Sequence, residues 1–391
     1  MNWLIGYGMS DKIIFLIRNV ARKNFGGGEI YQLKLAEKLK GSGFEPIIVT
    51  NSQELIGRAE KSGFKTLVPP YIRNQNWSGW RNLLLPIYFG YLWRLGRWYE
   101  EIFKYYKPEL VNIQSRDDFL AGTMAARKYG IRILWTDHAD FRNWVLWNVN
   151  TKYKNIIGKK IIKLSRKVEK VIFVSEKVAE ETAKMIYPKQ LKNTVIIENG
   201  VDDKLANYKD VSFKNNSFVY VGRVVDEKGI GELVKAFMMV VKKYPKAMLN
   251  IYGDGEIQKF KKMCEGCDNV KFHGPTDETI RVLVENEMFV LPSYREGLSL
   301  SLLEAAMMEK KIIASDVDGN PEVVVDGETG LLVPVKNVEK LAETMLWMLE
   351  HKSQAERMAQ NVRKRYEKKF NFEKIFEEKM LPLYNGEMET K

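Results

Sequence analysis

Short apolar runs alternate with longer stretches of helical periodicity along almost the whole chain. Apolar runs of this kind, bounded by turn residues and separated by helices, are typical of parallel sheets with crossover helices. The pattern therefore predicts an α/β chain of doubly wound sheets. The expected strands lie at 12–17, 46–50, 110–113, 131–135, 170–174 and 194–197 in the first half, and at 217–221, 247–252, 270–273, 288–292, 311–315 and 330–333 in the second.

A polar stretch, 207–216, interrupts the strand series before it begins again. A chain of 391 residues has room for two or three domains at roughly 150 residues each. We therefore expect two domains of similar size joined by this stretch. The predicted divisions are a first domain at 1–206, a linker at 207–216, a second domain at 217–370, and a C-terminal helix at 371–391 that crosses back to the first domain.

Composition narrows the class of protein. Hydrophobic residues make up 45% of the chain, which excludes a disordered protein. Two cysteines cannot stabilise a chain of this length by disulfide bonds, which excludes a small disulfide-rich scaffold. No N-terminal segment has the pattern of a signal peptide, and no apolar run approaches the roughly 18 residues of a membrane span. We expect a cytoplasmic protein that is soluble or peripheral.

The net charge of +12 belongs entirely to the first half of the chain. Residues 1–199 hold 33 basic and 18 acidic residues, a net charge of +15, which leaves −3 for residues 200–391. Such an asymmetry says more about partners than about fold. Nucleic acid, an anionic membrane surface or an acidic substrate are the candidates.

The segment 291–309 combines two carboxylates with a helix start. Glu296 lies in the loop after an apolar strand, and Ser299 can cap the following helix, which carries Glu304. A helix N-terminus attracts an anion, while carboxylates accept hydrogen bonds from neutral hydroxyls. The combination suits a phosphorylated sugar. The alternative is a solvated carboxylate beside an ordinary surface helix.

Two further strand-to-helix loops carry groups suited to phosphate. Residues 218–237 predict a strand, a turn and a helix, with Arg223 and Lys228 in the turn, where they could clamp a diphosphate. Solvated cations are the alternative. Three glycines at 26–28 form a loop whose amides could donate to phosphate, although the loop matches neither a P-loop nor the dinucleotide fingerprint, and a plain turn is the alternative.

Together these segments resemble glycosyltransferase family 4. The matching pieces, in the family's order, are FGGGE (25–29), WTDHAD (135–140), VSE (174–176), ENGVD (198–202), GR and EKG within 222–229, IYGDGE (251–256), VKFHG (270–274), PSYREGLSLSLLEA (292–305) and GNPEVVVDGETGLLV (319–333). The resemblance implies the GT-B fold, in which two Rossmann-like domains face a central cleft. It also implies a retaining, metal-independent enzyme that uses a nucleotide sugar as co-substrate and no cofactor.

The resemblance assigns roles around the donor. Arg223 and Lys228 would bind the donor diphosphate and Glu304 the ribose hydroxyls. The backbone of Leu298 and Ser299 would meet the distal phosphate.

Roles at the reacting sugar follow from the same resemblance. Glu296 would bind the sugar hydroxyls on the reacting face, and His138 matches the family's active-site histidine, so these two are the candidate catalytic residues. Gly27 and Gly28 would close over the distal phosphate from the other domain. Such a histidine can hydrogen-bond the sugar without being a general base.

The other histidines and the cysteines add little chemistry. His273 and Gly274 lie where the family's nucleotide base docks and form a possible base pocket. Cys264 and Cys267 are a single pair without a second pair at zinc spacing, so free thiols or a local disulfide are expected, and no metal site.

Aromatic and basic residues crowd the first half in a way that suits a lipid interface. Segment 71–107 holds Trp77, Trp80, Trp93, Arg94 and Arg97. A predicted helix at about 155–170 carries Lys159, Lys163, Arg166 and Lys170 on one face. Core packing and an ordinary solvated face are the alternatives. Nucleic acid is disfavoured, because no recognition module is present.

The predicted function is transfer of a hexose or N-acetylhexosamine from a nucleotide diphosphate donor, UDP-sugar slightly ahead of GDP-mannose. The acceptor would be a glycan or lipid-linked molecule on the inner face of the cell membrane. A nucleotide-sugar epimerase on the same fold and a non-catalytic glycan-binding protein stay open as alternatives.

Overall fold

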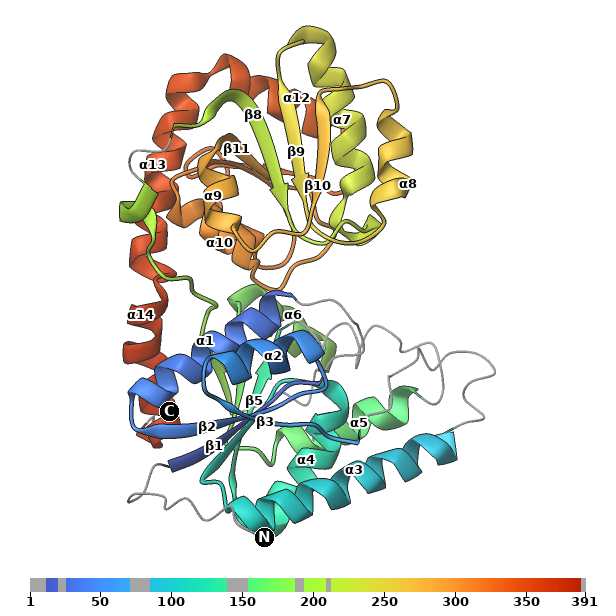
Figure 1. The fold of residues 1–391 in the computed structure, drawn as a ribbon, viewed down its shortest axis with the longest axis vertical. Coiled ribbons are helices and arrows are strands. Elements are labelled where there is room, and N and C mark those ends of the chain that lie inside the picture. The colour runs from blue at the N-terminus through green and yellow to red at the C-terminus, as the bar shows by residue number, and fades with distance from the viewer. Residues whose placement is uncertain are drawn as a thin grey trace. The chain divides into compact units, whose positions relative to one another are not determined.

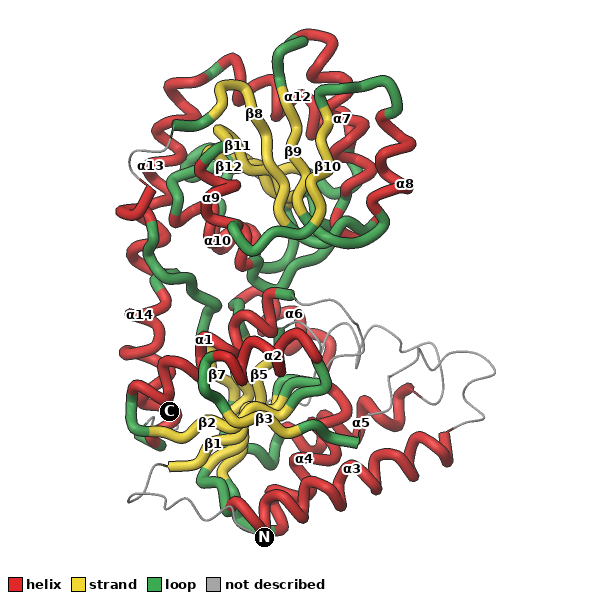
Figure 2. Tube along the Cα trace, viewed as in Figure 1, coloured by secondary structure: helices red, strands yellow, loops and turns green. Residues whose placement is uncertain are grey.

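The computed structural model describes residues 12–19, 26–70, 85–138, 154–186, 193–208 and 212–387. The chain forms two compact units, each with one parallel sheet between helices, which confirms the expected α/β class (Figures 1 and 2). The first unit comprises Met1–Val174, Ala179–Ile197 and Glu378–Lys391, and the second comprises Ser175–Val178 and Glu198–Glu377.

The first unit has strand order β3-β2-β1-β4-β5-β6-β7. In Figure 1, α1 and α2 lie on one face of the sheet and α3, α4 and α5 on the other. The strands are β1 (Lys12–Ile17), β2 (Phe44–Val49), β3 (Lys65–Leu67), β4 (Leu110–Ile113), β5 (Arg132–Asp137), β6 (Lys170–Phe173) and β7 (Thr194–Ile196). The helices are α1 (Gly27–Gly41), α2 (Gln53–Lys61), α3 (Leu85–Tyr106), α4 (Arg116–Lys128), α5 (Lys154–Ser165), α6 (Glu176–Ile186) and α15 (Leu381–Asn385).

The second unit repeats this plan with strand order β10-β9-β8-β11-β12-β13. Helix α7 packs against α8 and α12, and α10 packs against α9 and α13. The strands are β8 (Lys214–Val221), β9 (Met248–Tyr252), β10 (Val270–Gly274), β11 (Asn286–Leu291), β12 (Lys311–Ser315) and β13 (Leu331–Val333). The helices are α7 (Ile230–Lys243), α8 (Ile257–Lys261), α9 (Thr279–Val284), α10 (Leu300–Met307), α11 (Asn320–Val323), α12 (Val338–Glu350), α13 (Lys352–Lys369) and α14 (Phe372–Ile375).

Burial of the central strands explains why they could be found from the sequence. All six residues of β11 are buried, as are the last four of β1. A strand that is covered on both faces appears in the sequence as a continuous apolar run. Every expected strand is present. Strand β3 was missed because its three residues are exposed or half-buried and only one is apolar.

The helix predicted at 155–170 is too long, and this prediction is corrected. Helix α5 ends at Ser165, and the Asn193 amide donates to the carbonyls of Ser165 and Val168 at 2.9 and 2.7 Å, which satisfies backbone groups beyond the last turn. Lys170 is the first residue of β6, where it pairs in register with Leu134 and is only 8% exposed. It therefore does not belong to the basic face.

The last turns of the chain complete the first unit. The Arg132 guanidinium donates to the carbonyls of Leu383 and Tyr384 at 3.0 and 2.7 Å, and it also pairs with Glu169 at 2.8 Å. The Tyr384 hydroxyl accepts a hydrogen bond from Asn112 in β4. Residues more than 250 positions apart are thus held together by buried or half-buried polar contacts.

Candidate active site

The strand orders locate the expected ligand sites. In each sheet the order reverses once, between β1 and β4 in the first unit and between β8 and β11 in the second. Ligands of open parallel sheets bind outside the carboxyl ends of strands at such a switch point. The loops that follow these strands carry Arg18, Gln114, Arg223, Lys228, Glu296 and Ser299.

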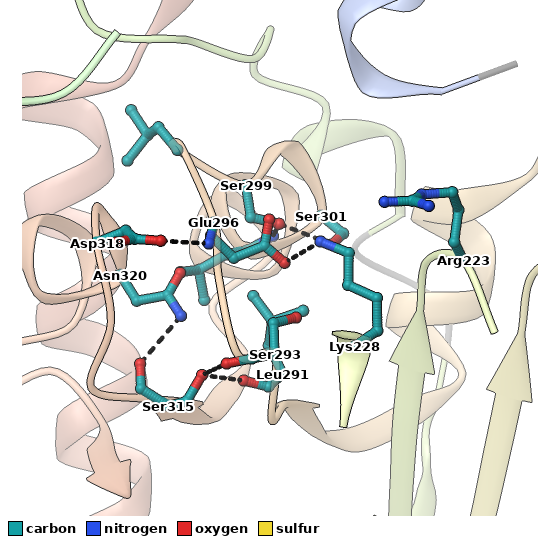
Figure 3. Close-up of polar contacts among 12 residues, drawn as sticks. Arg223, Lys228, Leu291, Ser293, Glu296, Ser299, Ser301, Ser315, Asp318 and Asn320 are labelled. Atoms are coloured by element: carbon teal, nitrogen blue, oxygen red, sulfur yellow. Dashed lines mark hydrogen bonds and ion pairs between the residues drawn. The ribbon is translucent and has the colours of Figure 1, made fainter. Parts of the chain in front are cut away.

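Lys228 and Glu296 form an ion pair in the second unit. The Lys228 Nζ atom lies 2.5 Å from Glu296 Oε1, and the two side chains are only 16% and 10% exposed (Figure 3). They come from the loops after β8 and β11, 68 residues apart in the chain. Lys228 is therefore not a solvated cation, nor Glu296 a solvated carboxylate.

A glycine brings these two loops together. Gly229 has φ +67° at the start of α7, and a Cβ atom there would lie 2.1 Å from the Pro292 carbonyl oxygen. A side chain would push the loops apart. The Tyr294 amide also donates to the Glu227 carbonyl at 2.9 Å. Backbone contact between the loops thus places Lys228 beside Glu296.

Arg223 stands on the same side of the site as Lys228. Figure 3 shows its guanidinium extending toward the space beside the Lys228–Glu296 pair. The buried Tyr220 hydroxyl donates to the Arg223 carbonyl at 2.8 Å and so holds the turn. Burial, and next the charge of Glu296, raise the pKa of Tyr220, so it stays a donor at neutral pH. Lys228 thus binds the Glu296 carboxylate, and Arg223 stands beside this pair.

Helix α10 begins where the sequence predicted. Ser299 is extended (φ −69°, ψ 123°), and its hydroxyl accepts a hydrogen bond from the Leu302 amide, so the expected N-cap is confirmed. Leu298 is buried, and its carbonyl accepts a hydrogen bond from Asn199 at 3.0 Å. Glu304 lies half-buried one turn into the helix. Backbone amides at a helix start attract an anion, and a carboxylate such as that of Glu304 can accept hydrogen bonds from hydroxyl groups.

A third loop, after β12, supports the loop that carries Glu296. Asp318 Oδ2 accepts a hydrogen bond from the Glu296 amide at 2.8 Å. A Cβ atom on Gly319 would lie 2.0 Å from the Gly297 carbonyl oxygen, so the two backbones touch. Sequence reasoning did not identify Asp318 as part of the site. A hydrogen bond to a distant backbone amide leaves no pattern in a single sequence.

The glycine loop of the first unit surrounds an arginine. The Gly26 amide donates to Glu29 Oε2 at 3.0 Å, and Glu29 Oε1 lies 3.1 Å from Arg18 Nε. A Cβ atom on Gly28 would lie 2.2 Å from Arg18 Nη2. The Arg18 guanidinium thus lies directly against Gly28, and a side chain there would require this guanidinium to move. Gly27 is the first residue of α1.

His138 follows β5 in the same unit and contacts Gln114 after β4. Its Nε2 atom lies 3.2 Å from Gln114 Oε1, and the Tyr31 ring packs edge-on against it at 5.3 Å between centroids. Burial, and then the charge of Arg18, lower the pKa of His138 well below its ordinary value. The imidazole is thus neutral at pH 7 and can both donate and accept.

His273 uses a ring nitrogen within the second unit. Its Nε2 atom lies 2.8 Å from Asn250 Oδ1, and the ring stacks on Tyr252 at 4.3 Å. Burial, and next the charges of Lys214 and Lys271, lower its pKa. Gly274 has φ +79°, and its carbonyl accepts the Gly253 amide at 2.7 Å. The base pocket at 273–274 stays a prediction.

The two cysteines do not form a disulfide bond. Cys264 and Cys267 are free thiols, and burial raises the pKa of Cys264. Within the described ranges, no group of three or more His, Cys, Asp or Glu side chains is arranged to hold a metal ion. None of the helices described here is long and apolar enough to cross a membrane.

The aromatic and basic segment is divided between core and surface. Tyr88, Leu95 and Tyr99 are buried along one side of α3, which confirms core packing for that stripe, whereas Trp93 is 71% exposed. The Lys160 Nζ atom lies 4.5 Å above the Phe89 ring and links α5 to α3. Trp77 and Trp80 lie outside the described residues. The remaining predicted surface residues are all exposed: Arg94, Arg97, Lys159, Lys163 and Arg166.

Comparisons with known proteins identify relatives of this chain. A family model described as Glycosyltransferase Family 4 matches residues 25–205, and one described as Glycosyl transferases group 1 matches residues 203–365. The capsular polysaccharide biosynthesis glycosyltransferase CapM of Staphylococcus aureus is 29% identical over 295 residues, which cover 71% of this chain and 77% of that protein.

The chain is also similar to a second Staphylococcus aureus enzyme and to a solved structure. The poly(ribitol-phosphate) alpha-N-acetylglucosaminyltransferase of Staphylococcus aureus is 27% identical over 267 residues, 67% of this chain and 51% of that protein. The crystal structure of Anabaena HepE in complex with UDP-glucose superposes with a TM-score of 0.76 at 16% identity, covering 96% of this chain and 100% of that one. The fold is therefore GT-B, as expected.

Proposed function

Because the chain belongs to glycosyltransferase family 4, we propose that it transfers a hexose or N-acetylhexosamine from a nucleotide diphosphate donor to a glycan or lipid-linked acceptor, with retention at the anomeric carbon. We propose a UDP-sugar as the first candidate for the donor and GDP-mannose as the second. The observation that carries the proposal is the shielded Lys228–Glu296 pair at the switch point of the second sheet, with Arg223 beside it. Such a site matches a donor that carries both a diphosphate and sugar hydroxyls.

In the proposed reaction the bond between the anomeric carbon and the donor phosphate oxygen breaks, and a bond to the acceptor oxygen forms on the same face. The acceptor proton passes to the departing phosphate oxygen, so no protein base is required. Arg223 and Lys228 stabilise the negative charge that grows on the diphosphate. No metal ion is invoked, because these cations supply the neutralising charge.

The remaining roles follow residue by residue. Glu296 accepts hydrogen bonds from sugar hydroxyls and Glu304 from the ribose. The amides of Leu298 and Ser299 and the loop of Gly27 and Gly28 contact the distal phosphate. His138 is proposed to hydrogen-bond the transferred sugar, a role supported by its neutral ring.

Donor and acceptor classes draw support from the relatives. UDP-glucose is bound in the HepE structure, and one of the two Staphylococcus aureus relatives is named as a poly(ribitol-phosphate) alpha-N-acetylglucosaminyltransferase. A UDP-sugar and an acceptor that carries phosphate are therefore the first to test. The rival activities on this fold are epimerisation of the nucleotide sugar and glycan binding without catalysis.

The test measures nucleotide release from UDP-sugars and GDP-mannose, with and without acceptor. Release that depends on acceptor supports the proposal. Release of an altered monosaccharide without acceptor indicates an epimerase, and binding without turnover indicates a glycan-binding protein. Thermal unfolding screens the donors first, since a bound donor stabilises the fold by RT ln(1 + [L]/Kd).

We also propose that α3 and α5 dock on an anionic bilayer. Exposed Trp93 and Tyr105 on α3 are of the kind found at lipid interfaces, and α5 presents exposed Lys159 and Lys163 one turn apart. Helix α4 packs against both helices. The +15 charge of residues 1–199 complements an anionic surface, which places the protein on the inner face of the cell membrane in this proposal.

Reversing two of these charges weakens binding to anionic vesicles. The double variant Lys159→Glu, Lys163→Glu loses at least about 30-fold in affinity, since each cation near the surface contributes on the order of 1 kcal/mol. Flotation with vesicles that contain phosphatidylglycerol measures this. The matched control is Lys364→Glu, Lys368→Glu, an exposed pair with the same spacing on α13. Equal flotation of both double variants contradicts the proposed docking surface.

A further inference from the structure

We propose that Asp318 is a positioning residue that sets the place of the Glu296 carboxylate. The inference rests on the proposed function, because it takes Glu296 to contact the donor sugar. Asp318 belongs to the loop after β12 and not to the motif that carries Glu296. It acts through a hydrogen bond to the backbone, so its own side chain need not touch the sugar.

Glu296 is held at both of its ends by charged groups from two other loops. The Asp318 carboxylate accepts its amide hydrogen at 2.8 Å, while the Lys228 ammonium binds its carboxylate at 2.5 Å. Figure 3 shows Asp318 and Lys228 on opposite sides of Glu296. A hydrogen bond with an ionised acceptor is stronger than a neutral one. Asp318 is only 9% exposed, so water competes little for this contact.

The backbone of Asp318 is strained. Its φ is +47°, in the left-handed region that a non-glycine residue rarely adopts. Glycine would take this conformation without a Cβ penalty, but it would lack the carboxylate that Glu296 needs. Strain of this kind persists where surrounding contacts determine the conformation, and it concentrates at functional sites.

Contacts with neighbouring residues hold the Asp318 loop in this strained conformation. Gly319 lies against the Gly297 carbonyl so closely that a Cβ atom would be 2.0 Å away. The fully buried Asn320 donates to the Ser315 carbonyl at 3.0 Å, which ties the loop back to the end of β12. The carboxylate of Asp318 is therefore presented from a fixed support.

Three substitutions separate the carboxylate from the strain. Asp318→Gly relieves the strain and removes the carboxylate, whereas Asp318→Ala keeps the strain and removes the carboxylate. Asp318→Asn keeps an acceptor oxygen in a residue that tolerates this conformation. We expect kcat with the sugar nucleotide to fall roughly 10- to 100-fold in the glycine and alanine variants, because misplacing a reacting contact has effects of this size. Asn restores most of the activity.

Measurements of thermal stability and of UDP affinity distinguish a positioning role of Asp318 from a role in folding or in nucleotide binding. Thermal unfolding should leave Asp318→Gly as stable as Asp318→Asn, so that a loss of kcat in the glycine variant is not a loss of fold. UDP affinity should be unchanged in all three variants. Asn216→Gly is the control for relief of backbone strain alone, since Asn216 also has a left-handed φ (+57°) but lies at the beginning of β8, where its amide donates to the Glu287 carboxylate at 2.6 Å.

Hydrogen exchange of the peptide 293–299 tests the contact without any turnover. Exchange at the Glu296 amide should speed up about tenfold in the glycine and alanine variants and not in Asp318→Asn. Faster exchange with kcat within about twofold of the wild type overturns the proposal, and so does unchanged exchange. If the wild-type protein turns over no sugar nucleotide, the proposed function fails, and the exchange result alone decides whether Asp318 holds Glu296.

Discussion

Replacement of Lys228 by alanine lowers the turnover of the sugar nucleotide by about 10²- to 10³-fold, the effect of removing one preorganised group that stabilises developing negative charge. Two consequences of the structure act together. The diphosphate loses a cation as the bond to it breaks, and Glu296 keeps a shielded carboxylate without its partner. The unpaired carboxylate then repels the phosphates. Steady-state kinetics at saturating acceptor measures the loss in kcat/KM.

A lysine at the far end of the helix that follows Lys228 provides the control for this substitution. Lys243 is the last residue of α7, at the opposite end from Lys228, and it pairs with Glu350 on the surface. Lys243→Ala should leave kcat/KM unchanged. Lys228→Arg keeps the charge and should retain part of the activity. If Lys228→Ala has kinetics like those of Lys243→Ala, the assignment of Lys228 to the diphosphate is wrong.

Substitution Glu296→Gln separates sugar recognition from nucleotide binding. Loss of the negative charge weakens hydrogen bonds from sugar hydroxyls, and we expect kcat to fall by roughly 10²-fold, in the range seen when a hydrogen-bond partner of the transition state is lost. UDP should bind as tightly as before or more tightly, because Lys228 no longer shares its charge with a carboxylate. Calorimetry with UDP and steady-state kinetics measure the two effects separately.

Glu285→Gln is the matched control for Glu296→Gln. Glu285 follows α9 and pairs with Arg281 on the surface, at the amino end of the sheet. This variant should have normal kcat and normal UDP affinity. A Glu296→Gln protein that loses UDP affinity but keeps its kcat would place Glu296 at the nucleotide and not at the sugar.

The fold was predictable wherever burial on both faces made strands apolar throughout. Strands β1, β4 and β12 begin and end at the predicted residues. Strand β3 gave no signal, because an edge strand is held by backbone pairing to β2 and needs few apolar side chains. The end of α5 was misplaced for a related reason: the helical spacing of lysines continues past Ser165, while the backbone turns there to reach β6.

The site was predictable where function depends on residue type at a loop after a strand. Lys228 and Glu296 were both identified, although nothing in a single sequence shows that they are in contact. The contact arises from Gly229 against Pro292, which is a property of two loops in three dimensions. Asp318 was missed for the same reason, since it acts on a residue from another loop, and Arg18 was missed although its partner Glu29 lies at the start of the helix that follows the same strand.

The return of the chain to the first unit after Glu377 makes that unit discontinuous in sequence. Carbonyls at Leu383 and Tyr384 satisfy the Arg132 guanidinium, and the Tyr384 hydroxyl satisfies Asn112 in β4. During synthesis these groups wait for residues more than 250 positions further along the chain, which are added at roughly 5–20 residues per second. The unit whose translation begins first is therefore completed only after the second unit has been translated.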